Sequence, residues 1–169
     1  KRCGHLDGKT LIHTEAMCHK VRAAADAKSD DFVLIARTDA RGIDGLDAAI
    51  ERGLAYREAG ADMIFPEGLA NADEFAAFAE QCPGLLLANM TEFGKTELIP
   101  LNTFGSMGYD LVIFPVTMQR IAMKAVVSAL STLHQDGHVE SLLDAMQTRQ
   151  ELYDLLDYTP GQAWGIDAD

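Results

Sequence analysis

The sequence contains little cysteine, few basic residues and no long apolar run. Its three cysteines, Cys3, Cys18 and Cys82, are odd in number and widely spaced, which argues against a disulfide scaffold or a cysteine metal site and favours a reducing, cytoplasmic compartment. Its 14 basic residues stand against 26 acidic ones, giving a net charge of −12, so nucleic acid and anionic lipid surfaces are poor partners. No apolar segment is long enough to cross a membrane, and we find neither a secretory signal nor a basic tract.

Four short apolar runs alternate with longer segments of helical pattern. Each run is too short for a helix and ends abruptly in polar residues, which is typical of the buried strands of a parallel sheet. The runs are residues 32–36, 63–65, 85–88 and 111–114, and they lead into segments that contain polar residues, at 37–39, 66–67, 89–92 and 115–117. The sequence therefore predicts an α/β fold whose sheet is covered on both faces, with ligands at the carboxyl ends of the strands.

The segments between these runs predict helices. Thr14 can cap a helix to about Lys28, and Asn71 with Glu74 has the spacing of a capping box for a helix to about Gln81. Another predicted helix ends at Gly60 and carries an apolar stripe of Leu46, Ile50, Leu54 and Ala55. A helix of roughly 18 residues begins at Met118, with Ile121, Val126, Leu130 and Leu133 on its buried side. One or two further helices are predicted within 139–156. Gly60 and the glycines near residue 108 each close a helix ahead of a strand, and this repetition fits a barrel better than a propeller or solenoid.

The first five residues, Lys-Arg-Cys-Gly-His, form a candidate reactive site. Cys3 follows two cations and precedes Gly4 and His5, a setting that suits proton transfer. A cysteine alone is more often a small buried apolar residue, and that interpretation is kept for Cys18 and Cys82.

Five segments together resemble the 2-methylisocitrate lyases of the isocitrate lyase / phosphoenolpyruvate mutase superfamily. They are residues 1–5 (Lys-Arg-Cys-Gly-His), 36–40 (Ala-Arg-Thr-Asp-Ala), 65–67 (Phe-Pro-Glu), 89–94 (Asn-Met-Thr-Glu-Phe-Gly) and 146–149 (Met-Gln-Thr-Arg). The resemblance runs in order from Lys1 to about Tyr158. Arg2 and the Asn-Met-Thr strand ending favour the methylisocitrate branch, because isocitrate lyases carry Lys-Lys-Cys-Gly-His and the mutases lack the cysteine motif.

The resemblance implies a (β/α)8 TIM barrel of which this chain would hold only about the last four strands and their helices. Residues 1–158 would form this C-terminal half of the barrel, and residues 159–169 a tail. The family's Mg²⁺ ligands and catalytic base lie upstream of the cysteine motif, so we name no metal ligand here and expect the chain to be a fragment of a larger enzyme. The family also forms homotetramers that exchange C-terminal helices.

The implied reaction is the cleavage of 2-methylisocitrate to pyruvate and succinate in the methylcitrate cycle of propionate catabolism. Breaking the C2–C3 bond leaves a carbanion that must be stabilised and protonated. By resemblance, Cys3 is the proton donor and His5 is a catalytic partner. Arginines hold substrate carboxylates in two-bond pairs. Glu67 faces the metal and substrate oxygens, and the neutral side chains of Asn89 and Thr91 add hydrogen bonds to a carboxylate. The implied substrate-binding residues are Cys3, Gly4, Arg37, Glu67, Asn89, Met90, Thr91, Arg120 and Arg149.

Most of these residues also have a purely structural interpretation. Arg37 can form an ion pair with Asp39, Glu67 can be an exposed loop carboxylate, and Asn89 can satisfy backbone groups at a turn. Arg149 can be ordinary surface charge. Four further histidines, His13, His19, His134 and His138, have no ligand spacing and are expected to be solvated.

Two other functions remain open. A related lyase or decarboxylase that acts on isocitrate, dimethylmalate or oxaloacetate would keep the arginines and the metal. A non-catalytic half-barrel that serves as an assembly module would need none of them, and the joint presence of Cys3, Arg37 and Glu67 argues against it.

Overall fold

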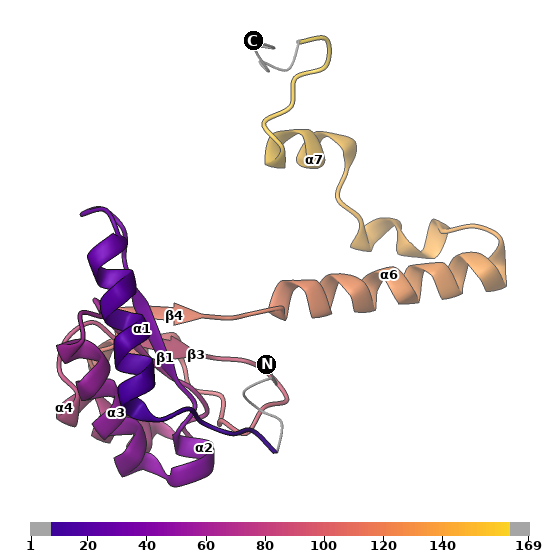
Figure 1. Ribbon diagram of the computed structural model, residues 1–169. Helices are drawn as coiled ribbons and strands as arrows, with labels where there is room; N and C mark the ends of the chain where they lie inside the picture. The colour runs from indigo at the N-terminus through magenta and orange to yellow at the C-terminus, as the bar shows by residue number, and fades with distance from the viewer. Residues whose placement is uncertain (1–7, 163–169) are drawn as a thin grey trace. The chain divides into compact units, whose positions relative to one another are not determined.

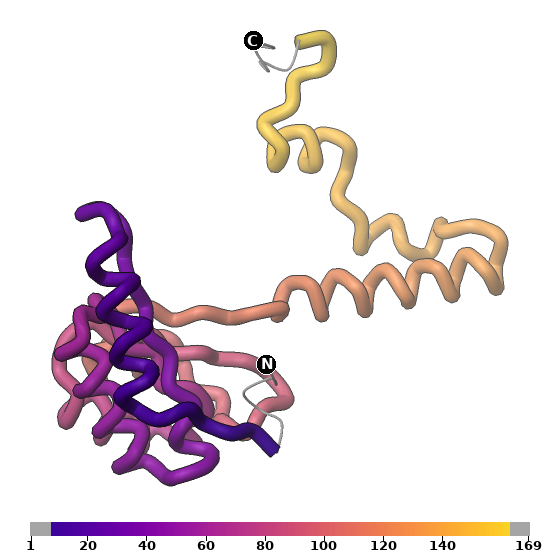
Figure 2. Tube along the Cα trace, viewed as in Figure 1, coloured from indigo at the N-terminus to yellow at the C-terminus, as the bar shows by residue number. Residues whose placement is uncertain are grey.

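The computed structural model describes residues 8–162 and divides the chain into two compact units, Lys1–Met118 and Gln119–Asp169. The first unit alternates strands with helices (Figure 1), whereas the second is helical, and its helical turns can be followed along the trace in Figure 2. Cys3, Gly4 and His5 lie outside the described residues, so the structure does not test the predictions made for them.

The first unit contains four parallel strands: β1 (Ile35–Thr38), β2 (Met63–Pro66), β3 (Leu87–Asn89) and β4 (Leu111–Ile113). β1 pairs with β2, β3 pairs with β4, and a parallel bridge between Ile64 and Leu86 joins the two pairs. Strands that are neighbours in space are therefore successive in the sequence, which is the order found in the wall of a (β/α)8 barrel. The predicted α/β class and its four strands are confirmed.

Two details of the strand prediction are wrong. β1 begins only at Ile35, so Phe32 and Val33 precede the strand and are 60% and 52% exposed. Ile35 and Leu111 are each 39% exposed, so the sheet is not covered on both faces along its whole width. β1 and β4 are the outermost of the four strands, and fewer of the described residues are available to cover them.

The helices of the first unit are α1 (Thr14–Ala27), α2 (Arg41–Asp44), α3 (Leu46–Glu58), α4 (Ala72–Gln81) and α5 (Leu101–Ser106). α3 contacts β1, β2, α1 and α4. Within its apolar stripe Ile50 is buried, whereas Leu54 is 38% exposed. Gly60 and Gly108 follow α3 and α5 with φ of +105° and +88°, a left-handed conformation that ends helices and favours glycine.

The predicted helix caps are partly confirmed. The side chain of Asn71 accepts a hydrogen bond from the backbone N–H of Glu74 at 3.1 Å, which caps α4. The Glu74 carboxylate forms a two-bond pair with Arg41 at 2.7 and 2.8 Å and makes no return bond to Asn71, so the capping box is incomplete. Thr14 is already the first helical residue of α1, and His13 at the capping position makes no side-chain cap.

An aromatic cluster anchors α4 and α5 within the first unit. Phe75, Phe104 and Tyr109 meet edge to face, with ring centroids 5.0 to 5.7 Å apart, and such pairs contribute about 0.5–1.5 kcal/mol each beyond the area they bury. The Tyr109 hydroxyl donates to the Phe75 carbonyl at 3.2 Å, and burial raises the pKa of this phenol. The cluster fixes the helices that flank β3 and β4.

The second unit comprises most of α6 (Thr117–Asp136), the 3₁₀ helix η1 (Glu140–Ala145) and α7 (Arg149–Leu155). The long helix and the two short terminal helices are confirmed. The predicted buried side of α6 is wrong for this unit, since Ile121, Val126, Leu130 and Leu133 are 46 to 62% exposed. Among residues 8–162, no helix combines the length and the apolar composition that a membrane span requires.

Candidate active site

Polar side chains from three neighbouring strands meet at one edge of the sheet. Arg37 lies in β1, Glu67 follows β2 directly, and Asn89 is the last residue of β3. The parallel register pairs Arg37 with Phe65, and the Glu67 backbone N–H donates to the Thr38 carbonyl at 2.9 Å. The carboxyl ends of the strands are thus level with one another, which is where ligands bind in parallel α/β folds.

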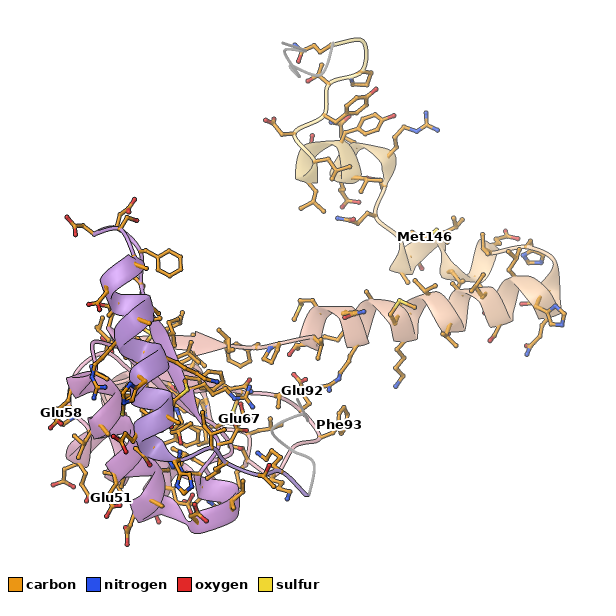
Figure 3. All side chains as sticks on the ribbon, in the orientation of Figure 1. Glu51, Glu58, Glu67, Glu92, Phe93 and Met146 are labelled. Atoms are coloured by element: carbon orange, nitrogen blue, oxygen red, sulfur yellow. The ribbon has the colours of Figure 1, made fainter. Side chains whose placement is uncertain are left out.

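Glu67 is at the centre of this cluster. Its side chain is only 1% exposed, and its Oε2 atom lies 3.3 Å from Arg37 Nη1 and accepts a hydrogen bond from Asn89 Nδ2, also at 3.3 Å. Figure 3 shows Glu67 within the first unit, whereas Glu51 and Glu58 point outward from α3. The alternative that Glu67 is an exposed loop carboxylate is therefore wrong.

Arg37 forms the ion pair with Asp39 that the sequence left open. Its Nε and Nη2 atoms donate to the two carboxylate oxygens of Asp39 at 2.9 Å each, and Lys9 Nζ donates to the same carboxylate at 2.8 Å. Burial would raise the pKa of Asp39, but the hydrogen bonds and charges of Arg37 and Lys9 outweigh it and lower that pKa. The guanidinium also lies over the Phe65 ring, 5.2 Å from its centroid. Arg37 is thus held in one orientation at the strand ends.

The side-chain amide of Asn89 uses only one of its two polar atoms in hydrogen bonds among the described residues. Nδ2 is directed at Glu67, and Oδ1 is buried without a hydrogen-bond partner among the described residues. An unpaired buried acceptor costs about 1–3 kcal/mol, which a donor group on a ligand would recover.

The two residues after Asn89 turn into the core. Met90 is 2% exposed, and its Sδ accepts a hydrogen bond from the backbone N–H of Ile99 at 3.1 Å. Thr91 is 8% exposed. Their burial anchors the loop that follows β3 and so fixes the end of that strand.

A second polar contact joins the loop after β3 to the beginning of α6. The Thr117 hydroxyl donates to Glu92 Oε1 at 2.6 Å. The neighbouring residues Phe93 and Val116 have φ of +61° and +56°, and for a β-branched residue such as Val116 this conformation is strained. Figure 3 shows Phe93 projecting from the loop, in agreement with its exposure of 95%.

Sequence reasoning missed Lys9 and gave Glu92 no role. Glu92 lies directly after a predicted strand, so its position was a signal that could have been used. Lys9 lies outside the strand ends, and nothing in its sequence context indicates that it reaches Asp39.

Arg120 and Arg149 belong to the second unit. Arg120 is exposed on α6, and Arg149 is the exposed first residue of α7. His13, His19, His134 and His138 are exposed, as expected for solvated histidines.

A pocket of about 400 Å³ opens next to Arg37 and Asp39, with Lys9, Arg52 and Tyr56 in its lining. This volume is within the usual range for sites that bind small molecules. Glu67 and Asn89 do not line it. The Arg37–Asp39 pair therefore lies between the pocket and the buried end of the cluster.

The residues at 8–162 hold no group of three or more His, Cys, Asp or Glu side chains with metal-binding geometry. Glu67 supplies one buried carboxylate, and Arg37 and Asn89 direct N–H groups toward it. The described part of the chain therefore does not fit a Mg²⁺ site on its own.

Sequence and structure comparisons agree on the relatives of this chain. Residues 3–134 match the family model described as phosphoenolpyruvate phosphomutase. The chain is 52% identical over 160 residues to a probable 2-methylisocitrate lyase of Corynebacterium glutamicum, an alignment that covers 94% of this chain and 52% of that protein. The chain thus spans about half the length of the curated relatives it matches.

Solved structures of the superfamily share the fold. A 2,3-dimethylmalate lyase matches with a TM-score of 0.82 at 36% identity, covering 93% of this chain and 54% of that one. An oxaloacetate acetylhydrolase bound to 3,3-difluorooxalacetate matches with a TM-score of 0.83 at 34% identity, covering 93% and 55%. A phosphonopyruvate hydrolase bound to oxalate and Mg²⁺ matches with a TM-score of 0.69 at 28% identity, covering 91% and 56%. The four successive parallel strands of this chain correspond to part of the (β/α)8 barrel of these proteins. The chain belongs to the phosphoenolpyruvate phosphomutase family.

Proposed function

We propose that this chain forms the C-terminal half of the barrel of a 2-methylisocitrate lyase, which cleaves 2-methylisocitrate to pyruvate and succinate. The observation that carries the proposal is the convergence of Arg37, Glu67 and Asn89 at the carboxyl ends of three successive strands. The similarity to proteins named 2-methylisocitrate lyase at up to 52% identity supports it. In this proposal residues 1–158 are the barrel half and residues 159–169 a tail.

Arg37 would bind a carboxylate of the substrate. A guanidinium presents a planar fork of N–H groups that matches a carboxylate, and lysine cannot reproduce this geometry. The two-bond pair with Asp39 supports this role, because it fixes the plane of the fork before a ligand arrives. Arg120 and Arg149 are proposed to bind further carboxylates of the substrate.

Asn89 would bind an oxygen that carries a proton. Because Nδ2 is directed at Glu67, the atom left over is Oδ1, which accepts hydrogen bonds. The C2 hydroxyl of 2-methylisocitrate is a donor of this kind. The geometry therefore favours a hydroxyl over a carboxylate as the substrate group that Asn89 binds. Thr91, Met90 and Gly4 would complete the substrate-binding set.

Cys3 is proposed to protonate the carbanion that remains on the succinate half after C–C cleavage, with His5 as its catalytic partner. Proton transfer by a positioned group contributes about 10²–10⁴-fold to the rate of such a reaction. Support comes from the sequence, where Cys3 and His5 stand in the Lys-Arg-Cys-Gly-His motif.

We also propose that the enzyme uses Mg²⁺. The presence of oxalate and Mg²⁺ in the related phosphonopyruvate hydrolase supports this. Because the described residues do not fit the ion by themselves, its ligands would lie elsewhere in the protein. A cytoplasmic homotetramer with exchanged C-terminal helices is the proposed assembly.

A second candidate is cleavage of a related diacid. The matches to a 2,3-dimethylmalate lyase and an oxaloacetate acetylhydrolase support it, at 36% and 34% identity. The higher identity to a protein named as a 2-methylisocitrate lyase favours the first candidate.

The test is an assay of the full-length protein with Mg²⁺ that measures the 2-oxo acid released, pyruvate from 2-methylisocitrate and glyoxylate from isocitrate, together with product analysis for 2,3-dimethylmalate and oxaloacetate. We expect the highest kcat/KM with 2-methylisocitrate. A higher kcat/KM for one of the other three acids would assign the enzyme to the second candidate, and no cleavage of any of the four would favour the non-catalytic module.

A further inference from the structure

Asp39 connects two parts of the candidate site. Its Oδ1 atom accepts hydrogen bonds from Lys9 Nζ at 2.8 Å and from Arg37 Nη2 at 2.9 Å, while its Oδ2 atom accepts from Arg37 Nε at 2.9 Å. The side chains of Lys9, Arg37 and Asp39 are 12%, 26% and 20% exposed, so all three are largely shielded from water. Lys9 follows Cys3 closely in the sequence. One carboxylate thus contacts both the arginine at the strand end and the segment that follows the cysteine motif.

We propose that Asp39 is a positioning residue. It fixes the plane of the Arg37 guanidinium and, through Lys9, holds the segment that follows Cys3. This inference rests on the proposed function, in which Arg37 binds a substrate carboxylate and Cys3 donates a proton. The ion pair is then part of the substrate site, and the structural and the ligand-binding interpretations of Arg37 are both correct.

Removal of the Asp39 charge has opposite expected effects on substrate binding, depending on whether Asp39 positions Arg37 or acts only through its charge. A carboxylate beside a site for an anionic substrate repels that substrate, so by charge alone its removal strengthens binding. A fork held by two parallel hydrogen bonds has a defined plane. Two other contacts of Arg37 constrain its plane less, since Glu67 lies at 3.3 Å from a single nitrogen and the Phe65 ring is 5.2 Å away. Positioning therefore predicts that removal of the charge weakens binding.

The decisive variant is Asp39→Asn in the full-length protein, because it keeps the shape and removes the charge. We expect kcat/KM for 2-methylisocitrate to fall by about tenfold to a hundredfold, as for the loss of a charged hydrogen bond. The Kd of succinate, measured by calorimetry, should rise at least about fivefold for the same reason. In an Arg37→Lys background, Asp39→Asn should change either quantity by less than about threefold, since residues that act as a unit are not additive.

Lys9→Met tests the second contact of Asp39. Loosening the segment after Cys3 should lower kcat about tenfold or more, the scale of one positioned proton transfer, and leave the succinate Kd within about twofold of wild type. An unchanged kcat would overturn the role of Lys9.

Glu74→Gln is the matched control. The Arg41–Glu74 pair is also a two-bond pair, at 2.7 and 2.8 Å, with side chains 29% and 21% exposed, but it shares no hydrogen bond or ion pair with Arg37, Asp39 or Glu67. Its loss should lower thermal stability by an amount similar to that of Asp39→Asn and leave kcat/KM and the succinate Kd unchanged.

The succinate measurement decides the inference separately from the proposed function. Unchanged or tighter succinate binding by Asp39→Asn would overturn the positioning role, as would a wild-type protein that does not bind succinate. If the wild-type protein binds succinate but does not cleave 2-methylisocitrate, the proposed function fails, while a raised succinate Kd in the variant still supports the positioning of Arg37 by Asp39.

Discussion

Replacing Glu67 by glutamine is the most direct test of the cluster at the strand ends. The substitution keeps the size of the side chain and removes its charge. In the structure the carboxylate is 1% exposed, with Arg37 Nη1 and Asn89 Nδ2 each 3.3 Å from Oε2. Both donors contact the same oxygen atom, so glutamine can keep this acceptor for both of them, but without the negative charge that strengthens the two contacts. Its NH₂ group replaces the other carboxylate oxygen.

The cost can be bounded from these contacts. Hydrogen bonds to charged groups contribute about 1.5–3 kcal/mol each, whereas breaking a fully buried ion pair costs about 3–5 kcal/mol. Arg37 is 26% exposed and keeps its two bonds to Asp39, so the lower range applies. We expect Glu67→Gln to lower the free energy of unfolding by about 1–3 kcal/mol. If the cluster binds substrate, kcat/KM should also fall by about tenfold or more, since each 1.36 kcal/mol of barrier is a factor of ten.

The assay is urea unfolding of the full-length protein together with pyruvate release. Glu51→Gln is the control, because Glu51 is an exposed residue of α3 (Figure 3), and changes at such surface positions usually stay within about 0.5 kcal/mol. If Glu67→Gln matches Glu51→Gln in both stability and kcat/KM, the cluster has no energetic or functional role and the reasoning is refuted.

Three further outcomes are expected. Cys3→Ser should abolish turnover and leave succinate binding nearly intact, because a serine hydroxyl is too weak an acid to donate the proton; retention of more than about a tenth of wild-type kcat would contradict the assignment. Gly53→Ala should destabilise the protein by about 1–3 kcal/mol through overpacking, because its new methyl group would lie 3.0 Å from Phe78 Cζ, and a neutral effect on urea unfolding would mean that α3 shifts freely. The Arg41 hydrogen bond lowers the pKa of Glu74 below its ordinary value of 4.5, so this pair stabilises the fold above about pH 4.5, and its contribution is lost as pH falls through the lower folded pKa. The difference in unfolding free energy between wild type and Glu74→Gln should therefore shrink in acid. A difference that grows in acid would contradict this argument.

The fold was predictable because its signals are local. A short apolar run that is bounded by polar residues favours a strand over a helix because of its length, and all four strands lie within a few residues of their expected places. The ends of elements were less predictable, since they depend on competition between side chains. Glu74 illustrates this: its spacing from Asn71 is that of a capping box, yet its carboxylate pairs with Arg41 from another helix.

The location of the candidate site followed from the same pattern, because parallel strands bring their carboxyl ends to one edge. The meeting of Arg37, Glu67 and Asn89 needed no more than that rule. The contacts that these residues make with other parts of the chain could not be predicted from this rule. The contact between Lys9 and Asp39 spans 30 residues, and no local spacing encodes a contact of that range.

The wrong predictions of burial share one physical cause. Periodicity indicates which face of a helix or strand is apolar, and such a face is stable in water only when another surface covers it. On α6 the stripe that contains Ile121 and Leu130 is present at helical spacing, yet these two side chains are 62% and 60% exposed. The outer strands repeat the pattern, with Ile35 and Leu111 each 39% exposed. The exposed fractions are those of this chain alone, and the chain spans about half the length of its curated relatives.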